Sequence, residues 1–142
     1  MVLIRREFVL DAPQPRVWDL IATTILQSLP VTQTEIVNDS TLRGILRLKL
    51  GFIEWPLPLQ IEVSDIVPMS RFATRVTVGE GLLRAVLNVA YELTDLEDDR
   101  TRIACCTTIE QAPRWMTLVR WQQRRFAAQM FDAVHVALER AC

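Results

Sequence analysis

The chain has little of what most catalytic and nucleotide-binding sites are built from. It carries four glycines, one histidine and one tyrosine among its 142 residues. Phosphate groups are usually held by glycine-rich loops, and no such loop, no dinucleotide fingerprint and no Gly-x-Ser-x-Gly elbow occurs. We therefore predict no catalytic residue and no cofactor.

The chain also lacks a charge excess and a long apolar run. Its formal net charge is −1, which gives no basis for a nucleic-acid partner. No uncharged apolar run reaches the ~18 residues that would predict a membrane span. The sequence leads directly into Ile4-Arg5-Arg6-Glu7 and shows no signal-peptide pattern. We expect a cytoplasmic protein with no integral membrane segment.

Cysteine and histidine are scarce and poorly spaced for a metal site. Two of the three cysteines, Cys105 and Cys106, are neighbours in a strand pattern, and the third is the last residue. Neighbouring strand residues point to opposite faces, so we expect free thiols in a reducing compartment. His135 has Asp132 and Glu139 near it on one helical face. No further histidine or cysteine is close in sequence, so we predict no metal site.

What the chain does have is apolar residues in regular patterns. Half of its residues are hydrophobic, which is enough for one core, and we predict a single domain over residues 1–142. The stretch Arg114 to Arg140 contains no glycine or proline and predicts one long amphipathic helix. Its apolar stripe consists of Trp115, Leu118, Val119, Phe126, Met130, Ala133, Val134 and Ala137. Trp121 and Phe131 fall off this stripe and indicate either flanking core or a contact surface for a protein partner or homodimer.

The preceding residues alternate between apolar and polar side chains. This pattern predicts strands over residues 2–10, 32–38, 42–50, 53–63, 72–78, 83–93 and 103–109. A helix is predicted between the first two strands, where Val17, Leu20, Ile21 and Ile25 recur at helical spacing. Each strand has one apolar and one charged face, which is typical of an antiparallel sheet covered on one side.

The segment Trp55-Pro56-Leu57-Pro58 places two prolines on the same lateral side of a strand. A central strand cannot lose two ladder hydrogen bonds on one side without a bulge or a local separation. The segment therefore predicts a place where the sheet is open, either beside the mouth of a cavity or at an ordinary edge.

The order of elements and several short motifs resemble the START-like superfamily, also called SRPBCC. The run from Phe8 to Ile21, with its Ala-Pro and Val-Trp steps, resembles the opening of these proteins. Gly79-Glu80-Gly81, Ala90 to Thr94 and Arg100 to Ile103 resemble the strands and turns of two groups. These are the polyketide cyclase/dehydrase and lipid-transport group and a group named after a component of carbon monoxide dehydrogenase. The resemblance implies an α+β helix-grip fold. A curved seven-stranded antiparallel sheet would wrap around a long C-terminal helix, with two short helices after the first strand.

This fold often encloses a cavity between helix and sheet, so the leading hypothesis is a non-enzymatic carrier of a hydrophobic small molecule. Candidate ligands are a lipid, an isoprenoid or quinone, or an aromatic. The predicted ligand-binding residues are Trp55, Leu57, Leu59, Phe72, Leu87, Tyr91, Thr107, Trp115, Val119, Phe126 and Met130. Tyr91 or Thr107 would donate a hydrogen bond, and Cys105 also points inward. The alternatives are a polyketide aromatase or cyclase, and an interaction or assembly module with a filled core.

Overall fold

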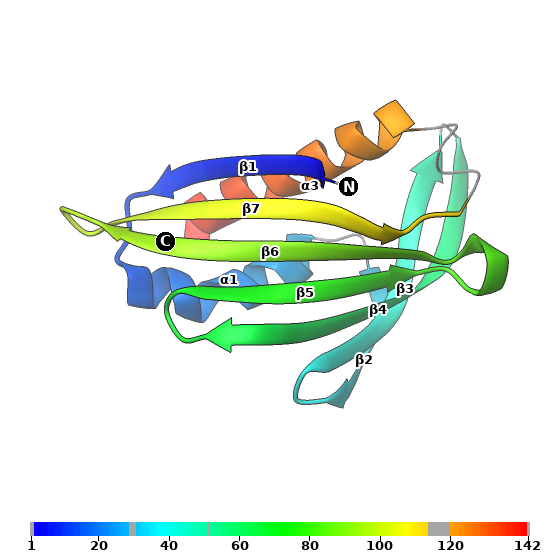
Figure 1. The fold of residues 1–142 in the computed structure, drawn as a ribbon, viewed down its shortest axis with the longest axis horizontal. Helices are drawn as coiled ribbons and strands as arrows, with labels where there is room; N and C mark the ends of the chain where they lie inside the picture. The colour runs from blue at the N-terminus through cyan, green and yellow to red at the C-terminus, as the bar shows by residue number, and fades with distance from the viewer. Residues whose placement is uncertain (1, 29–30, 51, 114–119, 142) are drawn as a thin grey trace.

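The computed structural model, which describes residues 2–28, 31–50, 52–113 and 120–141, has one sheet layer and one helix layer. Its elements are β1 (Val2–Leu10), α1 (Gln14–Ser28), β2 (Val31–Asn38), β3 (Thr41–Leu50), β4 (Ile53–Val67), β5 (Arg71–Val78), η1 (Gly81–Leu83), β6 (Ala85–Leu96), β7 (Arg100–Gln111) and α3 (Arg120–Ala141). The strands form a seven-stranded antiparallel sheet in the order β1-β7-β6-β5-β4-β3-β2. Figure 1 shows α1 and α3 behind this sheet, with β3 and the first part of β4 running steeply to β5, β6 and β7 before β4 bends to run beside β5.

The helix after β1 begins as its prolines predict. The Pro13 carbonyl accepts hydrogen bonds from the backbone N–H groups of Arg16 and Val17, and Pro15 sits in the first turn, where a missing N–H costs nothing. Within the described residues a single 15-residue helix, α1, lies between β1 and β2. The family resemblance implied two short helices there.

The other predicted elements lie where the alternation places them, with shifted ends. β4 extends to Val67, beyond the predicted end at Val63, and β6 begins at Ala85 after the short η1 turn. Gly79 and Gly81 adopt φ values of 83° and 58°, which favour glycine and explain why the turn uses it. The C-terminal helix is described from Arg120, and the predicted residues 114–119 lie outside the described part of the chain.

The two prolines of β4 mark the place where the sheet opens. β3 pairs with β4 along this whole segment, including Pro56 and Pro58, whereas the pairing of β5 with β4 starts only at Leu59. The N–H of Gly79, which directly follows β5, donates to the Pro58 carbonyl at 2.8 Å. The side of β4 toward which the Pro58 carbonyl points therefore faces β5. The missing proline N–H groups therefore point to the side of β4 that β5 leaves unpaired.

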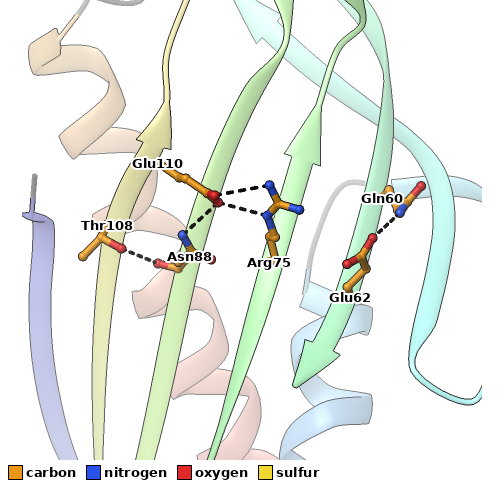
Figure 2. Close-up of polar contacts among 6 residues, drawn as sticks. All are labelled: Gln60, Glu62, Arg75, Asn88, Thr108 and Glu110. Atoms are coloured by element: carbon orange, nitrogen blue, oxygen red, sulfur yellow. Dashed lines mark hydrogen bonds and ion pairs between the residues drawn. The ribbon is translucent and has the colours of Figure 1, made fainter. Parts of the chain in front are cut away.

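The two faces of the sheet differ in chemistry. The face away from the helices carries an ion pair between Arg75 Nε and Glu110 Oε2 at 2.9 Å, and Asn88 Nδ2 donates to the same oxygen at 3.2 Å (Figure 2). The face toward the helices carries the apolar core. α3 packs against α1 and β1 on this side. No helix in the described ranges is long and apolar enough to cross a membrane.

Candidate functional site

Three rows of side chains cross β5, β6 and β7 on the helix-facing side of the sheet. From the pairing of the strands, the first row is Phe72–Tyr91–Cys105, the second is Thr74–Val89–Thr107 and the third is Val76–Leu87–Ile109. Directly paired residues of antiparallel strands share a face, and so do residues two apart on one strand. Burial decreases along this series. The first row is fully buried, the second keeps only Thr107 buried, and the third is half-buried throughout.

The apolar residues of this face form two separate clusters. One joins the first row to α1, α3 and β1 through residues such as Val17, Ile103 and Leu138. The other consists of Leu46, Leu59 and Ile61, with Val31, Leu42, Val76 and Val78 packed against it. No buried side chain among the described residues joins the two clusters. We call the first cluster the closed end, and the third row together with the second cluster the open end.

Three buried polar side chains lie in the first two rows of this face. Tyr91, Cys105 and Thr107 are only 8%, 5% and 7% exposed, which agrees with the prediction that they point inward. The Cys105 thiol hydrogen-bonds with both hydroxyl side chains. Burial raises the pKa of Cys105 to about 11, and burial also raises the pKa of Tyr91 above its ordinary value. All three groups are therefore uncharged at neutral pH.

The predicted ligand-binding residues are divided between the two ends. Phe72 and Tyr91 stack with ring centroids 5.0 Å apart at the closed end, and Thr107 lies buried one row further on. Leu59 belongs to the second cluster, Leu57 is buried opposite Leu46, and Leu87 is half-buried in the third row. The remaining predicted residues, namely Trp115 and Val119 and the side chains of Trp55, Phe126 and Met130, lie outside what the structure describes.

The ligand-binding residues predicted from the sequence did not include Val76 and Val89, which lie in the third and second rows. Both alternate correctly along their strands, so the periodicity marked them as inward. What the sequence did not supply was the register, which places Val76 beside Leu87 and Val89 beside Thr107.

On the described part of α3 the buried stripe shares Val134 with the predicted one and differs from it at the neighbouring positions. Phe131, Val134 and Leu138 are buried, whereas the predicted Ala133 and Ala137 are half-buried. Phe131 packs edge-on against Phe8 with ring centroids 5.1 Å apart. Phe131 is therefore flanking core, which was one of its two predicted roles, and it is not part of a contact surface.

His135 lies at the β1 edge of the core. Its ring stacks on Phe8 with centroids 4.0 Å apart, and its Nε2 lies 2.8 Å from Glu139 Oε1. Within the described residues no group of three histidine, cysteine, aspartate or glutamate side chains is placed to hold a metal. Cys105 and Cys106 are free thiols, with Cys105 buried and Cys106 half-buried, as expected for neighbours on opposite faces.

A separate groove of about 310 Å³ opens at the β4–β5 turn. Its lining residues are Val67, Ser70, Arg71, Glu92, Leu93 and Thr94. The Gln14 side chain spans this region by donating to the carbonyls of Met69 and Leu93. The groove lies at the opposite end of β6 from Leu87 and has a mixed polar lining, so it is distinct from the three rows.

The sequence matches no protein-family model and no curated protein, whereas the fold matches many solved structures. A conserved protein from Geobacillus kaustophilus superposes with a TM-score of 0.82 at 14% identity, over 96% of this chain and 91% of that one. A START superfamily protein from Mycobacterium smegmatis superposes with a TM-score of 0.65 at 13% identity, over 96% and 93%.

A third similar structure is DynU16, a protein of the dynemicin biosynthetic locus. Its TM-score is 0.61 at 16% identity, and the match covers 96% of this chain and 46% of that one. Likeness at such identities is evidence of a shared fold, and a fold alone does not specify a function. The chain has a START-like, helix-grip α+β fold.

Proposed function

We propose that the helix-facing side of the sheet binds a hydrophobic small molecule, such as a lipid, an isoprenoid or quinone, or an aromatic compound, and that the protein carries it. The ligand would lie along the open end and reach the second and first rows. Leu57, Leu59 and Leu87 would contact its apolar body, and Phe72 with Tyr91 would close the inner end. The proline segment of β4 would border the opening.

The observation that carries this proposal is the half-buried third row. Val76, Leu87 and Ile109 face the same side as the closed end but are only partly covered. Apolar side chains on a concave interior surface gain free energy when a ligand removes them from water, by about 25 cal/mol per Å². Ligand sites are mostly apolar surfaces with a few placed polar groups, and this face has that composition.

The alternative of a polyketide cyclase needs an interior group that moves a proton. The buried polar groups of the three rows are Tyr91, Cys105 and Thr107, and burial raises the pKa of the first two. A phenol or thiol of raised pKa is a poor base at neutral pH, although it remains a hydrogen-bond donor. These groups therefore favour binding over proton transfer. The interaction-module alternative would use Phe131 as part of a contact surface, and Phe131 is buried.

Native mass spectrometry of the purified protein, followed by solvent extraction and mass analysis, tests the proposal. We expect a stoichiometric apolar adduct, or saturable displacement of Nile red from emptied protein by members of a lipid, quinone and aromatic panel. Leu87→Trp should reduce binding by filling the open end, and Asn88→Trp on the outer face is the matched control. The absence of both an adduct and saturable binding across the panel would refute the carrier function.

A further inference from the structure

Three buried polar side chains on the helix-facing side of the sheet lie next to one another. Tyr91 on β6 pairs directly with Cys105 on β7, and Thr107 lies two residues beyond Cys105 on the same face. Each of the three is more than nine-tenths buried. Together they form a small polar patch at the boundary between the closed end and the half-buried rows.

Hydrogen bonding within this patch is weak. Both hydroxyl groups have the Cys105 thiol as their side-chain partner, and sulfur is a poor acceptor. Thr101 shows how the same fold satisfies a buried hydroxyl elsewhere, because its Oγ1 donates to the carbonyl oxygen of Ala12 at 2.8 Å. The Tyr91 phenol, a strong donor, has no comparable oxygen acceptor among the described side chains. An acceptor oxygen on a ligand would supply one.

Charge limits what this patch can hold. None of the nine residues of the three rows is ionisable except Tyr91 and Cys105, and burial keeps both neutral. The nearest basic residue by register is Arg6, opposite Cys105 on β1, and its side chain is exposed at the sheet edge. His135 at that edge is paired with Glu139. A carboxylate placed beside Tyr91 would lose its hydration without gaining a buried counter-charge from the described side chains, which is costly.

We propose that the ligand is an uncharged molecule with a carbonyl oxygen, which accepts a hydrogen bond from the Tyr91 hydroxyl while its apolar body lies along Leu87 and Val76. This inference rests on the proposed function and adds the chemical class of the bound group. Ketones, quinones and esters fit this description, whereas fatty acids and plain hydrocarbons do not. Thr107 would add a second donor to the same oxygen or to a neighbouring one.

The test compares three probes of equal chain length, namely 2-tridecanone, tridecane and tridecanoate, by Nile red displacement at neutral pH. We expect the ketone to bind roughly 3- to 10-fold more tightly than the hydrocarbon, which is the span of one hydrogen bond. The carboxylate should bind more weakly than the ketone. Tyr91→Phe keeps the ring that stacks on Phe72 and should abolish the ketone's advantage while leaving tridecane unchanged. Asn88→Ala on the outer face is the control.

Infrared spectroscopy of carbonyl-labelled 2-tridecanone keeps the test valid if Tyr91→Phe does not fold. In the wild-type protein the bound carbonyl stretch should lie below its value in alkane solution, because hydrogen bonding weakens the bond. A stretch equal to that in alkane, or a ketone preference that survives Tyr91→Phe, would overturn the carbonyl inference and leave the carrier function standing. Absence of saturable binding by all three probes and by the wider panel would instead refute the carrier function itself.

Discussion

The two ends of the helix-facing side of the sheet have the same sequence pattern and different environments. At the closed end Phe72, Tyr91 and Cys105 on β5, β6 and β7 are at most 8% exposed. At the open end Val76, Leu87 and Ile109 follow the same apolar alternation on the same strands and remain half-buried. The difference comes from what covers them, because α1 and α3 pack over the closed end. Identical strand patterns can therefore serve stability at one end and binding at the other.

This comparison predicts that stability is concentrated at the closed end. Leu138→Ala removes a fully buried side chain and should lower the free energy of unfolding by about 2–5 kcal/mol, as for other large-to-small core substitutions. Urea denaturation measures this loss. Val136 lies two residues away on α3 and is 46% exposed, so Val136→Ala should stay within about 0.5 kcal/mol of the wild type. Equal losses in the two variants would contradict the assignment of the helix faces.

Two buried threonines, Thr101 and Thr107, extend the comparison between the closed end and the binding surface. We expect their substitution to change the free energy of unfolding by less than Leu138→Ala does. Thr101→Val leaves the buried Ala12 carbonyl without its 2.8 Å hydrogen bond and should cost about 1–3 kcal/mol of unfolding free energy. Thr107→Val removes a contact with a thiol and should cost less, while weakening ligand binding. Thermal unfolding and Nile red titration of both variants separate these effects. A greater loss of stability in Thr107→Val would place the polar patch in the structural core.

The individual strands and turns could be predicted from the sequence because their signals are local, whereas the helix-grip arrangement followed from the family resemblance. Alternation identified every strand, Pro13 and Pro15 marked the start of α1, and the glycines at 79 and 81 marked a turn that needs positive φ. The open side of β4 followed from Pro56 and Pro58 because a proline lacks its N–H wherever it lies.

The burial of the residues in the candidate site could not be predicted from the sequence, because burial depends on packing between distant segments. Leu87 and Tyr91 lie on the same strand and face, and only the position of the helices makes one half-buried and the other buried. The inward position of Phe131 could not be predicted for a similar reason. Phe131 falls off the predicted stripe, and only its contact with Phe8, on a distant strand, brings it into the core.

At the open end we predict an effect on binding that exceeds the effect on stability. Leu87→Ala should lower the free energy of unfolding by only about 1 kcal/mol, because the side chain is already partly exposed. Ligand affinity should fall by about tenfold, since the lost methyl groups would otherwise be buried by the ligand. Isothermal titration calorimetry alongside urea denaturation gives both numbers. A stability loss as large as that of Leu138→Ala would mean that the open end is filled core.

The smallest effect is expected on the outer face, where the ion pair of Arg75 and Glu110 is solvated. Hydrogen bonds from Arg75 and Asn88 lower the pKa of Glu110, so this group stabilises the fold when ionised. Its contribution is complete above the ordinary glutamate pKa in the unfolded chain and is lost as the pH falls through the lower folded-state value. Glu110→Gln should therefore be slightly less stable than the wild type at neutral pH, and the difference should vanish in acid. Urea denaturation at both pH values measures the change.

Salt provides the second test of this solvated pair. Both side chains are more than two-fifths exposed, so 1 M salt should reduce the effect of Glu110→Gln at neutral pH. Glu97→Gln, in the β6–β7 turn, controls for the loss of a surface charge. An effect of Glu110→Gln that survives both acid and salt would show that the outer face is covered in solution, because only a covered ion pair escapes screening. The outer face would then have to be treated as a contact surface, and the contrast between a covered inner face and a solvated outer face would no longer hold.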